Sequence, residues 1–323
     1  MGNLLKGRWI STDQRPSGQF TRTDSQFRNW VTMDGSPGPS GSGGFKAEAG
    51  RYHLYVSLAC PWASRAIIFR SLKGLEQMVG LSVTHWLMAE HGWTFALGEG
   101  VVPDSVNGVE YLHQLYTRSD LACGGRVTVP VLWDKQRHTI VSNESGEIIR
   151  MFNSAFDRIG AQPGDYYPEP LRPEIDRINT RIYDTVNNGV YKAGFAGTQV
   201  AYEAAVVPLF QTMDWLEEHF QSRRFLVGEK PTEADWRLFT TLVRFDAVYH
   251  CHFKCNIRRL IDFPNLWSYT RELYQWPRIA DTVNLMHIKR HYYMSHRLIN
   301  PTGIVPAGPS INFDTPPSRN FGA

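Results

Sequence analysis

Cys60 is the residue whose type and position most clearly indicate chemistry. It begins the run Cys60-Pro61-Trp62-Ala63, between a predicted buried strand at 52–56 and a predicted helix that runs to about residue 73. Proline suits the first helical position because the amide proton that it lacks would have no partner there. A helix N-terminus, with its unpaired N–H groups and positive dipole end, favours the thiolate, which is the nucleophilic form of cysteine. We therefore interpret Cys60 as a nucleophile.

The third residue after Cys60 limits the thiol chemistry. Ala63 stands where a Cys-x-x-Cys redox motif has its second cysteine. A single thiol cannot resolve its own mixed disulfide, so an outside thiol is needed, and glutathione is the obvious cellular candidate. The alternative is that Cys60 is an inert buried residue, which is the more common fate of a free cysteine. Its place at a strand-to-helix turn argues against that alternative.

The elements around Cys60 predict two domains of different class, α/β followed by all-α. After the first helix we expect a strand at 81–87, a hairpin at 127–133 and 139–141, and a helix at 145–152. This βαβ plus ββα order is typical of a thioredoxin-like domain, here interrupted by an insertion at 88–126. Long insertions in compact domains are often functional. Past a linker rich in proline and glycine at 160–173, the pattern is helical almost throughout.

These patterns divide the chain into four parts. Residues 1–44 form a polar arm that ends in a Gly/Ser/Pro-rich run, although Trp9, Phe20, Phe27 and Trp30 suggest that parts of it dock. Residues 45–160 form the thioredoxin-like domain and residues 171–297 the all-helical domain. Residues 298–323 form a tail rich in proline and glycine that either wraps or dangles.

The composition argues against several classes of binding partner and cellular location. A formal charge of +3 over 323 residues is too small to indicate nucleic acid or a membrane surface. No apolar run approaches the roughly 20 residues of a membrane span, and the N-terminus lacks a signal-peptide pattern. Four cysteines (Cys60, Cys123, Cys251 and Cys255) are too few for a disulfide scaffold. We expect a cytoplasmic protein in a reducing compartment.

Two other patterns carry no catalytic role. Thr232 and Asp235, just before an apolar run, have the spacing of a capping box at a helix start, with Asp in place of Glu. His250, Cys251, His252 and Cys255 fit neither a zinc-finger spacing nor a redox pair. We therefore predict no metal site.

Five motifs in order resemble one class of glutathione transferases. A thioredoxin-like domain followed by a helical domain is the order of that superfamily. The more specific matches are to the glutathionyl-hydroquinone reductases, the Xi class; they are Cys60-Pro61-Trp62-Ala63, Gly92-Trp93-Thr94-Phe95, the run from Arg126 to Asp134, Ser142-Asn143-Glu144-Ser145, and His291-Tyr292-Tyr293-Met294-Ser295-His296. The resemblance implies a homodimer that uses glutathione as co-substrate and holds no bound cofactor.

The resemblance also implies a set of glutathione ligands. Ser145 would take the γ-glutamyl carboxylate at a helix N-terminus and Glu144 the ammonium group. Both residues could instead merely cap that helix. Val129, before a cis-proline step at Pro130, would pair with the cysteinyl part of glutathione, as an added strand would. Arg126 and Trp93 would contact glutathione through a guanidinium and a ring; otherwise they are an ordinary solvated arginine and a core tryptophan.

Tyrosines complete the implied site. Tyr191, Tyr292 and Tyr293 would hold a hydroquinone through their hydroxyls and rings, the first two also acting catalytically with Cys60. The reaction would pass through a Cys60–glutathione mixed disulfide and release oxidised glutathione. Tyrosines that only fill helix interfaces are the alternative, above all for Tyr293. The rival functions are an omega-like thiol transferase or dehydroascorbate reductase, and a non-catalytic assembly module.

Overall fold

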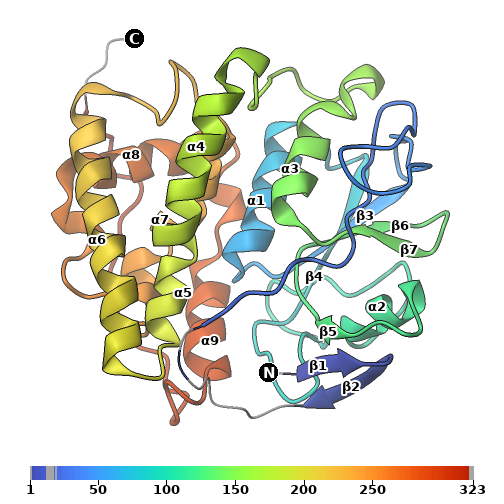
Figure 1. The fold of residues 1–323 in the computed structure, drawn as a ribbon, viewed down its shortest axis with the longest axis horizontal. Helices are drawn as coiled ribbons and strands as arrows, with labels where there is room; N and C mark the ends of the chain where they lie inside the picture. Colours follow the sequence, from blue (N-terminus) through green and yellow to red (C-terminus); the bar gives the residue numbers. More distant parts are fainter. Residues whose placement is uncertain (1, 12–17, 19, 320–323) are drawn as a thin grey trace. The chain divides into compact units, whose positions relative to one another are not determined.

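The computed structural model describes residues 2–11, 18 and 20–319, which form two compact units (Figure 1). The first holds residues 2–11 and 23–164, and the second holds residues 18, 20–22 and 165–319. The predicted arm is thus divided: Phe27 and Trp30 belong to the first unit, whereas Phe20 belongs to the second.

The first unit contains a four-stranded sheet in the order β4-β3-β6-β7. Its strands are β3 (Tyr52–Val56), β4 (Val79–Val83), β6 (Val131–Asp134) and β7 (Thr139–Ser142). β4 is parallel to β3, and β6 and β7 are antiparallel to their neighbours. Helices α1 (Pro61–Leu72) and α3 (Ser145–Ser154) pack against each other beside this sheet. The predicted thioredoxin-like fold is therefore confirmed.

One predicted strand was placed too late in the chain. The strand expected at 81–87 is β4, which begins at Val79 and ends at Val83. Its length matches β3, with which all five of its residues pair. After Val83 the chain turns, and the His85 ring accepts a hydrogen bond from the Leu87 amide at 3.0 Å. Hydrophobicity alone could not reveal where the pairing partner ends.

The arm contains two strands that the sequence analysis did not predict. β1 (Gly2–Leu5) and β2 (Arg8–Ser11) form a hairpin whose turn residues, Lys6 and Gly7, both have positive φ angles of 49° and 72°. That geometry suits a two-residue hairpin turn, and glycine adopts it without a Cβ penalty. β1 also pairs with β5 (Gly125–Arg126), so the arm and the end of the insertion share one sheet.

Buried polar side chains fasten the insertion to the sheet. It contains α2 (His113–Ser119), which packs against β7. Asp104 is buried and accepts hydrogen bonds from the Tyr55 hydroxyl at 2.8 Å and from the amides of Val106 and Val109. A buried carboxylate needs such donors to offset its lost hydration. The insertion is therefore an ordered part of the domain.

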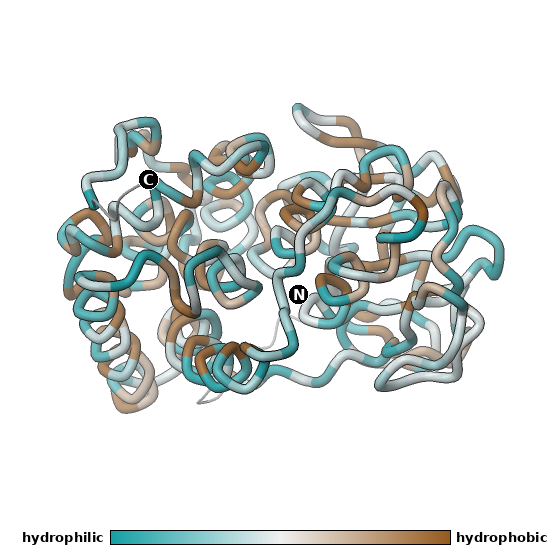
Figure 2. Tube along the Cα trace, turned by 90° about the horizontal axis from the view of Figure 1, so that it is seen from above, coloured by the Kyte–Doolittle hydropathy of each residue, from teal (hydrophilic) through white to brown (hydrophobic). Residues whose placement is uncertain are grey.

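The second unit is helical, as predicted. Its longer helices are α4 (Arg172–Ile182), α5 (Gly189–Gly194), α6 (Gln199–Ser222), α7 (Glu233–Leu242), α8 (Pro264–Tyr274) and α9 (Leu285–Ser295). Two π-helical turns, η3 (Tyr183–Asn187) and η4 (Phe245–Tyr249), precede α5 and follow α7. Polar and apolar residues alternate along these helices (Figure 2), and in α4 the buried residues Ile175, Ile178 and Ile182 recur at helical spacing. Among the described residues, no helix has the length and apolar character to cross a membrane.

The short helices of both units connect these elements. They are η1 (Asp157–Ile159), η2 (Glu169–Leu171), η5 (Leu260–Asp262) and η6 (Ala280–Thr282).

The capping box at the start of α7 is present as predicted. Asp235 is fully buried, and its Oδ2 accepts from the Thr232 amide at 2.7 Å. Its Oδ1 accepts from the Leu226 amide at 2.9 Å and from the Tyr269 hydroxyl at 2.8 Å. One carboxylate thus joins the start of α7 to the preceding loop and to α8.

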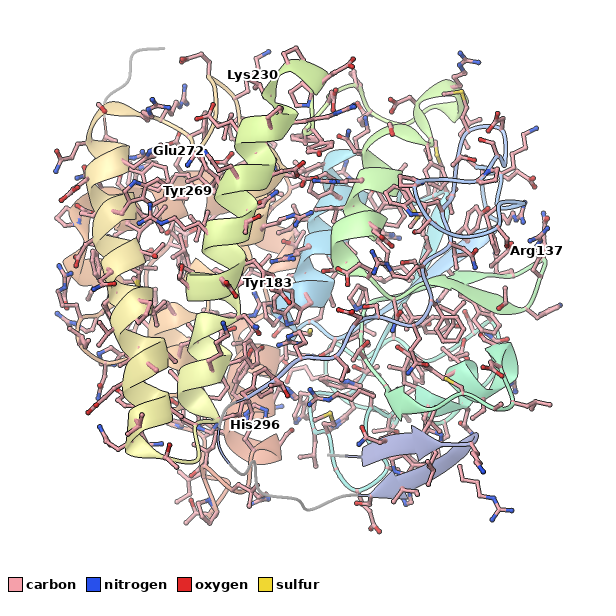
Figure 3. All side chains as sticks on the ribbon, viewed as in Figure 1. Arg137, Tyr183, Lys230, Tyr269, Glu272 and His296 are labelled. Atoms are coloured by element: carbon pink, nitrogen blue, oxygen red, sulfur yellow. The ribbon has the colours of Figure 1, made fainter. Side chains whose placement is uncertain are left out.

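The C-terminal tail wraps around the helical unit. Gln275 donates to the Phe313 carbonyl at 2.7 Å, and the Phe313 ring stacks on Tyr274. Arg319 donates to Glu272 at 2.6 Å and lies over the Tyr269 ring; both of these α8 residues are labelled in Figure 3. The sequence left open whether the tail wraps or dangles, and the described part of the tail wraps.

Replacing Asp235 with alanine should lower the free energy of unfolding by about 3 kcal/mol, because several buried donors lose their acceptor at once. Urea unfolding, monitored by tryptophan fluorescence, measures this change in the free energy of unfolding. Asp262→Ala removes a capping carboxylate at an exposed site and should change stability far less. Equal effects of the two substitutions would contradict the assigned role of Asp235.

Candidate active site

Cys60 lies where strand β3 turns into helix α1. The turn is held by hydrogen bonds from the Ala59 amide to the Ser57 hydroxyl at 3.3 Å and from the Cys60 amide to the Ser57 carbonyl at 3.2 Å. Cys60 is the N-cap residue of α1, its side chain caps no amide, and Pro61 is the first helical residue. The thiol is half-buried. Its Sγ lies 3.7 Å from the carbonyl oxygen of Val129.

Val129 is held in place by a polar network behind it. The Val129–Pro130 peptide is cis. The buried Tyr116 hydroxyl, from α2, donates to the carbonyl of Thr128 at 2.8 Å and accepts from the Thr128 amide at 3.1 Å. It also accepts from the Asn143 side chain at 3.1 Å. The insertion therefore positions the chain segment that faces Cys60.

Glu144 and Ser145 begin helix α3. Glu144 caps the helix through a 3.0 Å hydrogen bond from the Gly146 amide to its Oε1, so the capping alternative is correct as far as it goes. Its other oxygen accepts from the Ser25 hydroxyl at 2.9 Å. Ser145 is buried. Capping leaves room for a ligand role, because a carboxylate has about four lone-pair sites.

Arg126 and Trp93 come from the two ends of the insertion. Arg126 is in β5, where it pairs with Asn3 of the arm. Trp93 is buried, with its carbonyl accepting from the Leu112 amide at 2.9 Å. Trp9 of the arm donates to the Glu90 carbonyl at 2.9 Å and stacks on His113. The arm thus supports both ends of the segment that carries these two residues.

The second unit brings two of the three predicted tyrosines together and adds a third. The hydroxyl of Tyr292 on α9 lies 2.5 Å from that of Tyr191 on α5 and 2.9 Å from that of Tyr249, the last residue of η4. We call these three residues the phenol cluster. Tyr292 and Tyr249 are buried, and Tyr191 is half-buried. Gly194 has no Cβ to collide with the Phe253 ring, which packs against Tyr191 and Tyr292.

Histidines adjoin the phenol cluster, and Tyr293 lies among them. The Tyr293 ring is 4.8 Å from that of His252, and burial raises the pKa of Tyr293 to about 12. His252 and His296 share a 3.2 Å hydrogen bond; His296, just past α9, is labelled in Figure 3. Burial lowers the pKa of His252 to about 4 and that of His296 well below its usual value. Both imidazoles are therefore neutral at neutral pH.

Sequence reasoning missed Ser25, Tyr116 and Tyr249. Each acts through a partner distant in the chain, and none belongs to a motif with recognisable spacing. The sequence offered no signal for them. In the structure, Tyr249 ends a π-helical turn, and such turns are frequent at functional sites.

The remaining cysteines differ from Cys60 in position. Burial raises the pKa of the Cys123 and Cys255 thiols, which disfavours their reactive form. Cys251 is exposed in a turn, next to His250. Within the part of the chain that the structure describes, no three histidine, cysteine or carboxylate side chains are grouped to hold a metal ion.

Comparison with known proteins agrees with this architecture. The family model for the N-terminal domain of glutathione S-transferases matches residues 59–155, and the model for their C-terminal domain matches residues 199–272. The chain is 56% identical to the glutathionyl-hydroquinone reductase PcpF of Sphingobium chlorophenolicum, over 96% of this chain and 97% of that protein.

Two further relatives cover nearly the whole chain. The glutathionyl-hydroquinone reductase YqjG of Escherichia coli K12 is 55% identical over 99% of both chains. Its glutathione-bound structure has a TM-score of 0.93. A Xi class glutathione transferase from Natrialba magadii has a TM-score of 0.90 at 45% identity, over 98% of this chain and 96% of that one.

A thioredoxin-like domain with a cysteine at a helix start, followed by a helical domain, is the architecture of a glutathione transferase. Within that superfamily, the chain belongs to the Xi class, the glutathionyl-hydroquinone reductases.

Glu144→Gln separates the capping role from the ligand role. Glutamine keeps an oxygen for the Gly146 amide but loses the charge that would pair with the ammonium group of glutathione. We expect nearly unchanged stability and about tenfold to a hundredfold weaker glutathione binding by calorimetry. Glu147→Gln, in the same helical turn, is the matched control and should bind normally. Unchanged affinity in Glu144→Gln would move the ammonium site elsewhere.

The histidine pair predicts acid sensitivity of the helical unit. Both pKa values are lower in the folded state, so the unfolded chain binds more protons as the pH falls below about 6.5. Stability should be full above about pH 6.5 and be lost progressively toward pH 4. His252→Asn removes one titrating group, so its melting temperature should fall less between about pH 7.5 and pH 5. The same pH dependence in His252→Asn as in the wild type, or an equal flattening in His250→Asn, would contradict this interpretation.

Proposed function

We propose that this protein reduces S-glutathionyl-hydroquinones to hydroquinones through a mixed disulfide between Cys60 and glutathione. The observation that carries the proposal is the position of Cys60 at the N-terminus of α1, with Sγ beside the Val129 carbonyl. The names of the relatives PcpF and YqjG, and the glutathione in the YqjG structure, support the substrate class.

The chemistry takes two steps, and no metal or redox cofactor takes part. The Cys60 thiolate attacks the sulfur of the glutathionyl group, so that an S–S bond forms and the S–C bond to the ring breaks. The ring carbon keeps the electron pair and takes a proton. A second glutathione thiolate then attacks the mixed disulfide, which releases oxidised glutathione and restores the Cys60 thiolate.

We assign the binding of glutathione to residues of the first unit. Ser145 and the first amides of α3 would bind the γ-glutamyl carboxylate, and Glu144 the ammonium group. The backbone of Val129 would pair with the cysteinyl part. Arg126 and Trp93 would contact the remainder, Arg126 as a carboxylate partner.

We assign the hydroquinone to the phenol side chains of the second unit. Tyr191 and Tyr292 already share a hydrogen bond, so their hydroxyls could bond the ring oxygens or deliver the proton that the ring carbon needs. Tyr293, which lies against His252, would contribute its ring. A cytoplasmic location and a homodimer complete the proposal.

Cys60→Ser tests the nucleophile. An alcohol is a far weaker nucleophile of similar size, so reduction of a glutathionyl-hydroquinone should be abolished while glutathione still binds. Mass spectrometry of the wild type in oxidised glutathione should show one adduct, on Cys60. Adducts on Cys123, Cys251 or Cys255 in place of Cys60 would contradict the assignment of Cys60 as the nucleophile. Faster turnover of dehydroascorbate than of the hydroquinone would favour the omega-like alternative, and no thiol transfer at all would favour the assembly module.

A further inference from the structure

The phenol cluster extends from a half-buried tyrosine to a fully buried one. Tyr191 is half-buried, Tyr292 is 1% exposed and Tyr249 is 0% exposed. The central hydroxyl, that of Tyr292, has a phenol on either side, at 2.5 Å and 2.9 Å. When the donors run from Tyr249 to Tyr292 to Tyr191, the proton of Tyr191 is left for a group outside the cluster. A negative charge on Tyr292 would accept two hydrogen bonds.

A buried arginine accompanies this cluster. Arg244 is 1% exposed and comes directly before η4, the turn that ends at Tyr249. Its Nη1 donates to the Thr240 carbonyl at 2.7 Å, which fixes the side chain against α7. Burial raises the pKa of both Tyr249 and Tyr292 well above the usual value, and the charge of Arg244 acts in the opposite direction on both.

Other titratable groups adjoin the cluster. The Arg22 guanidinium, from the arm segment of this unit, lies 5.3 Å from the centre of the Tyr191 ring. The imidazoles whose rings contact Tyr292 are those of His252, His291 and His296. Their ring centres lie 5.3 to 6.4 Å from that of Tyr292, whose hydroxyl shares hydrogen bonds with the phenols of Tyr191 and Tyr249.

We propose that Tyr249 and Arg244 hold the negative charge that forms when Tyr191 gives its proton to the leaving ring carbon. Both are positioning residues, since they act through Tyr292 and not on the substrate. The inference rests on the proposed function and deepens it, because it names how the helical unit supports protonation of the ring.

The proton steps balance. As the S–C bond breaks, the ring carbon takes the electron pair and the proton of the Tyr191 hydroxyl, which leaves a phenolate on Tyr191. Tyr292 passes its proton to Tyr191, so the negative charge moves to Tyr292. There the Tyr249 hydroxyl donates to it and the Arg244 cation attracts it. A proton from solvent, taken up through Tyr191, restores the cluster, and no tyrosine is oxidised or reduced.

Electrostatics gives the physical reason for this arrangement. An isolated buried phenol is a poor acid, because low dielectric penalises its anion. Hydrogen bonds to a charged oxygen are about twice as strong as neutral ones, and fixed donors need no reorganisation during the reaction. A phenolate on Tyr292, which lies between two phenols, therefore costs less than an isolated buried phenolate, and the charge of Arg244 acts in the same direction.

The consequence is a dependence on the leaving ring. A hydroquinone with electron-withdrawing chlorines expels a stabilised carbon anion and needs little help from an acid. A ring with electron-donating methoxy groups needs protonation as it leaves. Loss of the charge-holding residues should therefore slow electron-rich substrates more than electron-poor ones, whereas general damage to the fold would slow both alike.

The test measures kcat for glutathionyl derivatives of a chlorinated and a methoxylated hydroquinone in Tyr249→Phe, Arg244→Met and Arg244→Lys. We expect Tyr249→Phe and Arg244→Met to slow the methoxylated substrate about tenfold to a hundredfold, and the chlorinated one much less. Arg244→Lys keeps the charge and should recover much of the rate. Tyr202→Phe removes a phenol of the same unit that donates to the Lys254 carbonyl and should change neither rate.

Reduction of a small glutathione mixed disulfide, which has no ring carbon to protonate, is the internal reference. Equal losses on both hydroquinones, or on the mixed disulfide as well, would overturn the inference and leave only a structural role. Unchanged rates in Tyr249→Phe would also overturn the inference. If Arg244→Met does not fold, the rates of Tyr249→Phe alone decide whether the inference holds. Failure of the wild type to reduce either hydroquinone would instead overturn the proposed function.

Discussion

The central constraint of the first unit is the pairing of strand β3 on both of its edges. β4 binds one edge in parallel and β6 binds the other in antiparallel register, with Tyr55 opposite Val131. The start of β6 is thereby fixed against the end of β3, and the chain segments just outside this pairing carry Val129 and Cys60. The 3.7 Å approach of the Cys60 sulfur to the Val129 carbonyl follows from that register. A shift in register would separate the two and reverse the faces of the strand.

Hydrogen bonds of buried and half-buried polar side chains attach the less regular segments to this sheet. Tyr55 and Asp104 fasten the insertion, Tyr116 holds Thr128, and Ser25 reaches Glu144. A donor left without its acceptor in such a place costs more than the bond itself contributes, so each network specifies one arrangement. The arm and the insertion are therefore held in place as specifically as the strands are.

The same physics has a different use in the helical unit. Asp235 is a buried carboxylate surrounded by donors, and its work is structural: it joins α7 to α8 and to the loop before it. The phenol cluster is a set of hydroxyls that share hydrogen bonds with one another, and two of its three tyrosines are buried. Burial raises the free-energy cost of charge in both places, but in the phenol cluster hydroxyls bond to hydroxyls, so each oxygen can either donate or accept.

The sequence by itself determined what depends on neighbours in the chain. Pro61 at the first position of α1, the capping box of Thr232 and Asp235, and the helical spacing of buried residues in α4 all follow from contacts within a few residues. The position of Cys60 as a helix N-cap was predictable for the same reason. The tertiary structure alone decided the pairing of Asn3 with Arg126, the bond from Ser25 to Glu144, and the inclusion of Tyr249 beside Tyr292. Those partners stand up to 123 residues apart, and no local pattern encodes them, because they are selected by the packing of whole elements around a shared core.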